Sequence, residues 1–301
     1  MPRRLAVVDM GSNTLKFSVT EVEPSGEERV IHAHAETVRL GAGVALRGSI
    51  EPDRIERALL ALRHYELVAK SFGVEALIGV ATAALRMASN DDDLLDRIHR
   101  TTGWDISVIT GADEARLAFK GLAGSLPLGK DSLLVDIGGG STELMSVVNR
   151  TLVASESLEI GSGTLADRCF EHDPPGLAAI LEAISDAGEA LLLSSVLPIS
   201  NAAAVLFSGG NGQFLKAFAN WSVVDIPFTP QRFRDVLSSL AALDSVPLAS
   251  YLEIAPERAR MLPAGAAIAM AVIDRAQPES IGAVPSGIRG GLVADWIATH
   301  P

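Results

Sequence analysis

The sequence has little cysteine and no long apolar run. Cys169 is the single cysteine in 301 residues, which excludes an internal disulfide bond and fits a reducing compartment. No apolar run reaches the roughly 18 residues that a transmembrane helix needs. Asp9 interrupts the apolar segment that follows Arg3 and Arg4, so the N-terminus does not match a signal peptide. We therefore expect a cytoplasmic protein with no membrane partner.

Positive charge is also in short supply. The chain has 25 lysines and arginines against 37 acidic residues, and its formal net charge is −12. A nucleic-acid-binding surface would be basic, so no nucleic-acid partner is expected. An anionic substrate would require the cationic side chains to be gathered at one place, where the local potential matters more than the total charge.

Histidine spacing suited to a metal site is absent as well. His32 and His34 lie two apart on an expected strand, hence on one face, but no third ligand follows them. The acidic run 91–93 is typical of the first turn of a helix. We interpret the histidines as surface residues, the acidic run as a helix start, and Cys169 as a packing residue rather than a nucleophile.

What the chain does contain is a glycine-rich turn pattern that occurs twice. One apolar strand leads through Asp9 into Gly11-Ser12-Asn13-Thr14, and another leads through Asp136 into Gly138-Gly139-Gly140-Ser141-Thr142. Glycine lets the backbone approach an oxyanion closely, and successive N–H groups of such a turn form an anion-binding nest. An Asp at a strand end is suited to holding Mg²⁺, mostly through water. The duplication predicts two similar domains, in keeping with the chain length and its 48% hydrophobic residues.

Hydrophobic periodicity and turn residues predict the same plan in each half. In the first half we expect strands at 5–8, 15–21, 28–36, 76–81 and 106–110, and helices at 52–72, from 90, and at 113–121. In the second half we expect strands at 133–137, 142–149, 151–158, 203–207 and 280–284, and helices at 175–193, after the turn 208–212, at 257–275 and at 287–296. The small-residue run 121–130 is the expected boundary, which gives domains 1–122 and 123–301.

Two such halves, each opening with an Asp-Gly loop, resemble the actin-like superfamily of ATPases, sugar kinases and heat-shock chaperones. Within it the chain resembles the exopolyphosphatase and guanosine pentaphosphate phosphohydrolase family, in its short two-domain form. The resemblance rests on five motifs in order: Asp9-x-Gly-Ser-Asn13, Val38-Arg39-Leu40-Gly41, Ala81-Thr82-x-x-Leu85-Arg86-x-x-x-Asn90, Gly111-x-Asp-Glu114-Ala-Arg116-Leu117 and Asp136-x-Gly-Gly-Gly-Ser-Thr-Glu143. It implies an α/β fold of two actin-like (ribonuclease H-like) domains, each a mixed sheet flanked by helices, with a cleft between them.

The resemblance also implies residue roles. The family's general base is the acid before Ala-Arg, here Glu114, while Asp136 and Glu143 serve metal and water positioning and Arg86 lies near the phosphates. A place in the first turn of a helix suits Glu114, because the positive helix end favours an ionised carboxylate. Asp113 points about 100° away around the helix and is the second choice. Mg²⁺ is the implied metal, with Mn²⁺ as an alternative and Asp9 as a further ligand, and a homodimer is implied.

Candidates for phosphate binding are of two kinds. Guanidinium groups match phosphate oxygens bidentately, and the candidates are Arg39, Arg86, Arg116 and Arg289, with a structural role left open for each. The turns supply backbone N–H, hydroxyl and amide donors, from Gly11, Ser12, Asn13, Thr14, Gly138, Gly139, Gly140, Ser141 and Thr142, joined by Gly209. Lys16 either reaches a phosphate or only flanks a strand.

Two positions depart from the family pattern. Thr164 stands where an Arg is usual, and Gly290 stands where a Glu follows the Arg. Both Asp loops and Glu114 are intact, so we interpret the chain as a metal-dependent hydrolase of terminal phosphoanhydride bonds, with inorganic polyphosphate as the favoured substrate. Guanosine pentaphosphate is the alternative substrate. A non-catalytic sensor of polyphosphate or an alarmone, and a kinase of the same superfold, are the alternatives of other classes.

Overall fold

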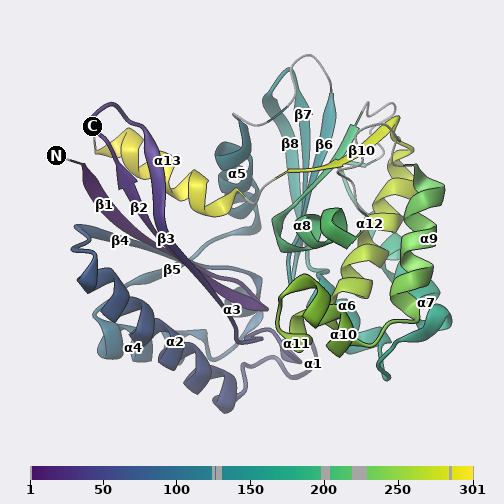
Figure 1. The fold of residues 1–301 in the computed structure, drawn as a ribbon, viewed down its shortest axis with the longest axis horizontal. Coiled ribbons are helices and arrows are strands. Elements are labelled where there is room, and N and C mark those ends of the chain that lie inside the picture. Colours follow the sequence, from purple (N-terminus) through teal and green to yellow (C-terminus); the bar gives the residue numbers. More distant parts are fainter. Residues whose placement is uncertain are drawn as a thin grey trace. The chain divides into compact units, whose positions relative to one another are not determined.

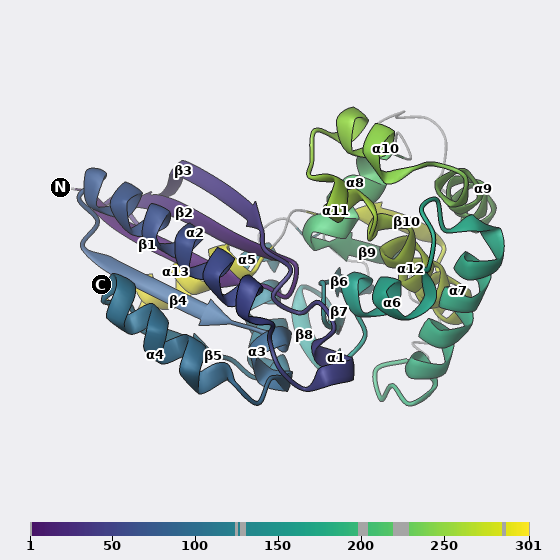
Figure 2. The same cartoon turned by 90° about the horizontal axis from the view of Figure 1, so that it is seen from below.

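The computed structural model describes residues 2–123, 126, 131–197, 204–218, 229–284 and 287–300. The chain divides into two compact units, which can be followed in two views (Figures 1 and 2). Unit 1 comprises Met1–Gly121 and Ile288–Pro301, and unit 2 comprises Leu122–Gly287. The chain therefore leaves unit 1 after residue 121 and returns to it for its last helix.

Unit 1 is built on a five-stranded mixed sheet in the order β3-β2-β1-β4-β5. Its strands are β1 (Arg3–Met10), β2 (Thr14–Val22), β3 (Glu28–Thr37), β4 (Ala76–Ala81) and β5 (Ile106–Val108). β2 pairs antiparallel with β1 and β3, whereas β4 runs parallel to β1 and β5. Short turns join the antiparallel strands and helices cross between the parallel ones, as each kind of pairing requires.

The helices of unit 1 cover both faces of this sheet. They are α1 (Val44–Arg47), α2 (Pro52–Ser71), α3 (Ala83–Met87), α4 (Asp91–Thr102), α5 (Gly111–Leu122) and α13 (Ile288–Thr299). α2 and α4 pack together on one face, and α13 lies on the other face against β1 (Figures 1 and 2). Pro52 begins α2, where its missing N–H costs no hydrogen bond, and the helix buries Ile55, Leu62 and Tyr65 toward the sheet.

Unit 2 repeats the sheet. Its strand order is β10-β9-β6-β7-β8, with β7 antiparallel to β6 and β8, and β9 parallel to β6 and β10. The strands are β6 (Ser132–Ile137), β7 (Thr142–Val148), β8 (Thr151–Leu158), β9 (Ala204–Ser208) and β10 (Ser280–Ala283). In each unit the duplicated Asp lies near the end of the first strand, directly before the turn to the second.

The core of unit 2 is built around one helix. The helices are α6 (Ser162–Cys169), α7 (Gly176–Leu192), α8 (Gly209–Phe218), α9 (Pro230–Ala241), α10 (Ser245–Leu252), α11 (Pro256–Ala259) and α12 (Leu262–Ala276). Every residue from Leu262 to Ile273 is buried, and α12 packs against α6, α7 and α9. A helix that is apolar on all sides is expected in such a central place.

The structure confirms the predicted α/β plan of two similar halves, but three details differ. The expected helix 257–275 is divided into α11 and α12, with Pro263 in the first turn of the second helix. The sequence patterns did not single out α9 or α10 as separate helices. The closing helix, expected within the domain 123–301, packs against β1 of unit 1.

The expected boundary run 121–130 lies largely outside the described residues. Its described part includes Gly121 and Leu122, between which the division into units falls. Among the residues that the structure describes, no helix has the length and apolar character needed to cross a membrane.

Candidate active site

Asp9 of unit 1 is a buried carboxylate with a cation beside it. It lies in cross-strand register with Lys16, and Lys16 Nζ is 3.4 Å from Asp9 Oδ2. Asp9 is 2% exposed. A buried charge is costly unless it is paired, so Lys16 is needed locally to offset the charge of Asp9. Lys16 therefore binds Asp9, and a contact of Lys16 with phosphate stays a prediction.

The first glycine turn is held in shape by the segment that follows β3. Asn13 O accepts hydrogen bonds from the backbone N–H groups of Val38 (3.1 Å) and Arg39 (2.9 Å), and Ser12 O accepts one from Gly41 N (2.8 Å). The motif 38–41 is therefore a support for the turn. The contacts are made to the carbonyl oxygens of Ser12 and Asn13.

Two side chains of this region carry signs of a binding site. Arg39 has a φ of 57°, in the left-handed region that a non-glycine residue rarely adopts and that clusters at functional sites. The buried Ser12 Oγ has no hydrogen-bond partner within the described residues. Thr14 is buried in the same turn. A buried hydroxyl that lacks a partner calls for an explanation, and a bound anion would supply one.

Glu114 lies in the first turn of α5 and is 5% exposed. Arg86, from α3, donates through Nη1 to Glu114 Oε2 (2.7 Å) and to the backbone carbonyl of Ile109 (3.0 Å). The structure thus brings together the two residues that the sequence assigned to the base and to the phosphates. Because one guanidinium nitrogen also contacts the β5–α5 connection, the orientation of the Glu114 carboxylate is tied to the backbone that precedes its helix.

Asp113, the neighbouring acid, is half-exposed and has other partners than Glu114. Thr110 Oγ1 accepts from Asp113 N (3.1 Å) and donates to Asp113 Oδ2 (2.7 Å), so this pair caps the start of α5. Arg116 Nε is 3.8 Å from Asp113 Oδ1. The capping role accounts for Asp113, and Glu114 remains the better candidate for the base.

Arg116 and Arg289 make contacts within unit 1. Arg116 Nη1 lies 2.9 Å from Asp295 Oδ2 of α13. Arg289 Nη1 donates to the carbonyl of Phe17 in β2 (3.2 Å). Each arginine therefore has a structural contact within unit 1, and its phosphate-binding role stays a prediction.

In unit 2 the position of Lys16 is taken by a second acid. Asp136 and Glu143 are cross-strand partners of β6 and β7, and they are 6% and 2% exposed. Ser157 Oγ donates to Glu143 Oε1 (2.8 Å). Cross-strand residues have their Cβ atoms about 5 Å apart. Two buried carboxylates at this spacing repel each other, so a cation between them would be favourable.

The second glycine turn is bound by the start of α6. The backbone N–H of Ser162 donates to Gly138 O (2.9 Å), and those of Gly163 and Thr164 donate to Gly139 O (2.8 and 3.1 Å). A Cβ on Gly161 would lie 2.5 Å from the backbone of Gly139 and Gly140, so only glycine permits this approach.

Thr164 completes this arrangement. Its Oγ1 accepts from Gly161 N (2.9 Å) and donates to Gly161 O (3.0 Å), which caps α6. Thr142 Oγ1 donates to Ile160 O (2.6 Å), and Ser141 is buried. The departure at Thr164 is therefore a helix cap that supports the turn 138–140.

The turn between β9 and α8 closes around Asp136. Gly209 has a φ of 73°, and a Cβ there would lie 2.1 Å from Asp136 Oδ1. Asn211 Nδ2 donates to Ile137 O (2.7 Å). Ser208 is in register with Asp136, hence on the same face of the sheet, and its buried Oγ has no partner within the described residues.

The family model for the Ppx/GppA phosphatase family matches residues 19–300. The chain belongs to this family. It is 26% identical to Exopolyphosphatase 1 of Mycobacterium tuberculosis over 300 residues, which cover 96% of this chain and 87% of that protein. Family membership makes it an enzyme of the phosphatase class.

Solved structures of the family show the same fold. The PPX-GPPA enzyme of Aquifex aeolicus is 26% identical, covers 98% of this chain and 100% of its own, and superposes with a TM-score of 0.75. An exopolyphosphatase of Cytophaga hutchinsonii, 24% identical, covers 99% and 98% and gives a TM-score of 0.89. The two units are accordingly the actin-like domains that the resemblance implied.

For a member of this family, the donor set of unit 2 fits a magnesium ion. Mg²⁺ in proteins is commonly held by one or two carboxylates together with waters and substrate phosphates. Asp136 and Glu143 supply the two carboxylates, and Ser208 Oγ is a third oxygen on the same face. Among the described residues, no group of three or more His, Cys, Asp or Glu side chains could hold a metal ion, so such an ion would need waters or substrate oxygens to complete its coordination.

One cationic side chain near the turn between β9 and α8 was not singled out from the sequence. Arg258 of α11 lies so close to Gly210 that a Cβ there would be 2.5 Å from its Nη2, and its Cζ is 4.3 Å from the centre of the Phe214 ring. Burial lowers the pKa of Arg258. The sequence pattern predicts Arg258 inside one long helix, 257–275. Its place beside Gly210 follows from the division of that helix into α11 and α12.

Proposed function

We propose that this protein is a metal-dependent exopolyphosphatase that releases the terminal phosphate from inorganic polyphosphate. The observation that carries the proposal is the buried Glu114–Arg86 pair at the start of α5, with its 2.7 Å contact. The name of the Mycobacterium tuberculosis relative supports the choice of substrate. A cytoplasmic location and a homodimer, both expected from the sequence analysis, are part of the proposal.

In the proposed reaction Glu114 acts as the general base. The oxygen of a water molecule forms a bond to the terminal phosphorus while Glu114 accepts the water proton. The bridging P–O bond breaks, and the shortened polyphosphate chain leaves with the bonding electrons. Arg86 holds the Glu114 carboxylate in a fixed orientation, and positioning of this kind supplies a large part of such catalysis.

Asp136 and Glu143 would hold the Mg²⁺ ion, with Mn²⁺ as an alternative. The bound ion would neutralise charge that develops on the phosphoryl oxygens. The turns 11–14 and 138–142 would bind phosphate oxygens through their backbone N–H groups. Ser12 and Arg39 would add side-chain contacts, since the first has an unsatisfied hydroxyl and the second a strained backbone.

The test is phosphate release from medium-length polyphosphate with Mg²⁺, measured for the wild type and for Glu114→Gln. Glutamine keeps the size of the side chain but cannot accept the proton, so turnover should fall at least about a hundredfold with binding retained. Asp113→Asn is the matched control, since it removes the neighbouring acid of the same helix turn. Equal turnover by Glu114→Gln and the wild type would overturn the role of Glu114.

The same assay with guanosine pentaphosphate decides between the two substrates. A higher kcat/KM for guanosine pentaphosphate would replace polyphosphate as the substrate and leave the chemistry unchanged. Tight binding of either compound without phosphate release would instead identify a sensor. We expect polyphosphate to be hydrolysed with the higher kcat/KM.

A further inference from the structure

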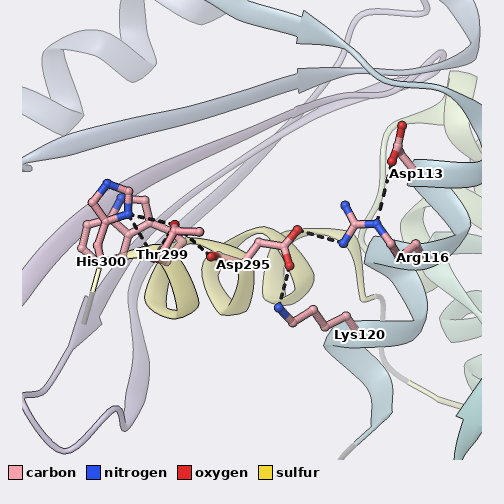
Figure 3. A network of polar contacts seen from close by, with 7 residues as sticks. Asp113, Arg116, Lys120, Asp295, Thr299 and His300 are labelled. Atoms are coloured by element: carbon pink, nitrogen blue, oxygen red, sulfur yellow. Dashed lines mark hydrogen bonds and ion pairs between the residues drawn. The ribbon is translucent and has the colours of Figure 1, made fainter.

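The helix that carries Glu114 is joined to the last helix of the chain by one carboxylate. Asp295 of α13 accepts hydrogen bonds from Arg116 Nη1 (2.9 Å) and from Lys120 Nζ (2.5 Å), both on α5 (Figure 3). The two donors lie four residues apart, so the carboxylate bridges successive turns of one helix face. Arg116 also reaches Asp113, which extends the network to the first turn of α5.

Backbone contact fixes the same helix crossing. A Cβ on Gly291 would lie 2.1 Å from Leu117 O, and a Cβ on Gly290 would lie 3.4 Å from Gly121 Cα. Glycine therefore lets α13 approach the α5 backbone at Leu117, between the two residues that Asp295 binds. The departure at Gly290 lies in this close crossing.

This crossing is adjacent to the proposed base. Glu114 and Leu117 are three residues apart and lie on one face of α5 in neighbouring turns. A helix moves as a rigid element, so a shift at Leu117 or Arg116 moves the Glu114 carboxylate as well. The Glu114 carboxylate is also held by Arg86, which belongs to α3.

The ion pair between Arg116 and Asp295 contributes little to the stability of the whole protein. The side chains of Arg116 and Asp295 are 49% and 37% exposed, and ion pairs between side chains this exposed contribute little to stability. Burial opposes ionisation of Asp295, but hydrogen bonds from Lys120 and Arg116 outweigh it and lower the pKa of Asp295. The carboxylate is thus ionised at neutral pH, and its chief effect is on geometry.

We propose that Asp295 is a positioning residue for the base Glu114, acting through Arg116, Lys120 and the α5 helix. The inference rests on the proposed function, because it assigns a part in the same reaction. It predicts a loss in kcat with little change in KM, since the substrate contacts are left in place.

The experiment compares phosphate release by Asp295→Asn, Asp295→Glu and Asp274→Asn. Asp274 is a matched control, because its contact with Arg234 (2.6 Å) has side-chain exposures of 43% and 47% but lies in unit 2, between α12 and α9. We expect Asp295→Asn to lower kcat about tenfold with KM within about twofold, since small misplacements of a catalytic group have large effects on rate. Asp295→Glu keeps the charge and should restore most of kcat, and Asp274→Asn should resemble the wild type.

Hydrogen exchange supplies a readout that does not depend on turnover. Amides of residues 111–122 should exchange faster in Asp295→Asn than in the wild type or in Asp274→Asn. Equal kcat values for Asp295→Asn and Asp274→Asn, beside an active wild type, would overturn this inference alone. A wild type without phosphate release would instead show that the proposed function has failed.

Discussion

Arg86 and Glu114 form a largely buried ion pair that joins α3 to α5, with side chains 19% and 7% exposed. The pair lies where the parallel strands β4 and β5 end, since α3 follows β4 and α5 follows β5. A charge removed from water is stable only beside its partner. The pairing of these two charges therefore matters for the stability of unit 1 as well as for the proposed chemistry.

Removing one partner should destabilise the protein more than removing both. Arg86→Ala leaves the Glu114 carboxylate buried without its guanidinium, and we expect the free energy of unfolding to fall by about 3 kcal/mol. The double variant Arg86→Met, Glu114→Gln should recover at least half of this loss, although it has no turnover. Urea denaturation of the wild type and both variants measures the difference. If the double variant is as unstable as Arg86→Ala, the charge is not the cause.

Gly291→Ala should destabilise unit 1, because its Cβ would lie 2.1 Å from Leu117 O. Relief of such a clash costs roughly 1–3 kcal/mol. Gly290→Ala, where the nearest atom is 3.4 Å away, is the control and should be tolerated. Thermal unfolding of both variants tests this, and equal melting temperatures would show that α13 does not lie as described.

Metal binding should distinguish the two duplicated aspartates. Asp136→Asn and Glu143→Gln should each weaken Mn²⁺ binding at least about tenfold, since each removes one of two carboxylates. Asp9→Asn should change it by less than about twofold, because Lys16 already offsets the charge of Asp9. Electron paramagnetic resonance titration with Mn²⁺ measures this without turnover. Strong weakening by Asp9→Asn would add Asp9 to the ligand set.

The thiol of Cys169 should be unreactive in the folded protein at pH 8. Burial, and then the negative charges of Asp186 and Glu182, raise the pKa of this thiol from 9.0 to about 11. A raised pKa means that the folded state holds the proton more tightly than the unfolded state. The corresponding stability is present below pH 9 and is lost as the pH rises toward 11. Rapid reaction with an aromatic disulfide reagent at pH 8 would contradict this, and Cys169→Ala should abolish the pH effect.

Patterns local in the sequence predicted most of the fold. Strand β4 (Ala76–Ala81) and strand β8 (Thr151–Leu158) were predicted to the residue, because alternation and turn residues mark their ends. The break between α11 and α12 was missed, since the apolar pattern runs on past Arg260. Hydrophobic periodicity indicates which residues are buried. Because α11 and α12 both bury residues in the same core, it does not show where one helix ends and the next begins.

The site was harder to predict wherever a role depends on a distant partner. The motifs assigned Glu114 to the base and Arg86 to the phosphates, and the contact between the two side chains joins α3 to α5. Arg116 illustrates the limit, because it pairs with Asp295, which lies 179 residues later in the chain. No local pattern distinguishes an arginine that binds phosphate from one that binds a carboxylate contributed by a later helix.

The return of α13 to unit 1 has a consequence for biosynthesis. Unit 2 is an insertion between α5 and α13, so all of its polypeptide is synthesised before α13 is made. Until then, β1 is without the helix that covers it and α5 is without Asp295. The helix bearing the proposed base should therefore settle only after α13 has been synthesised.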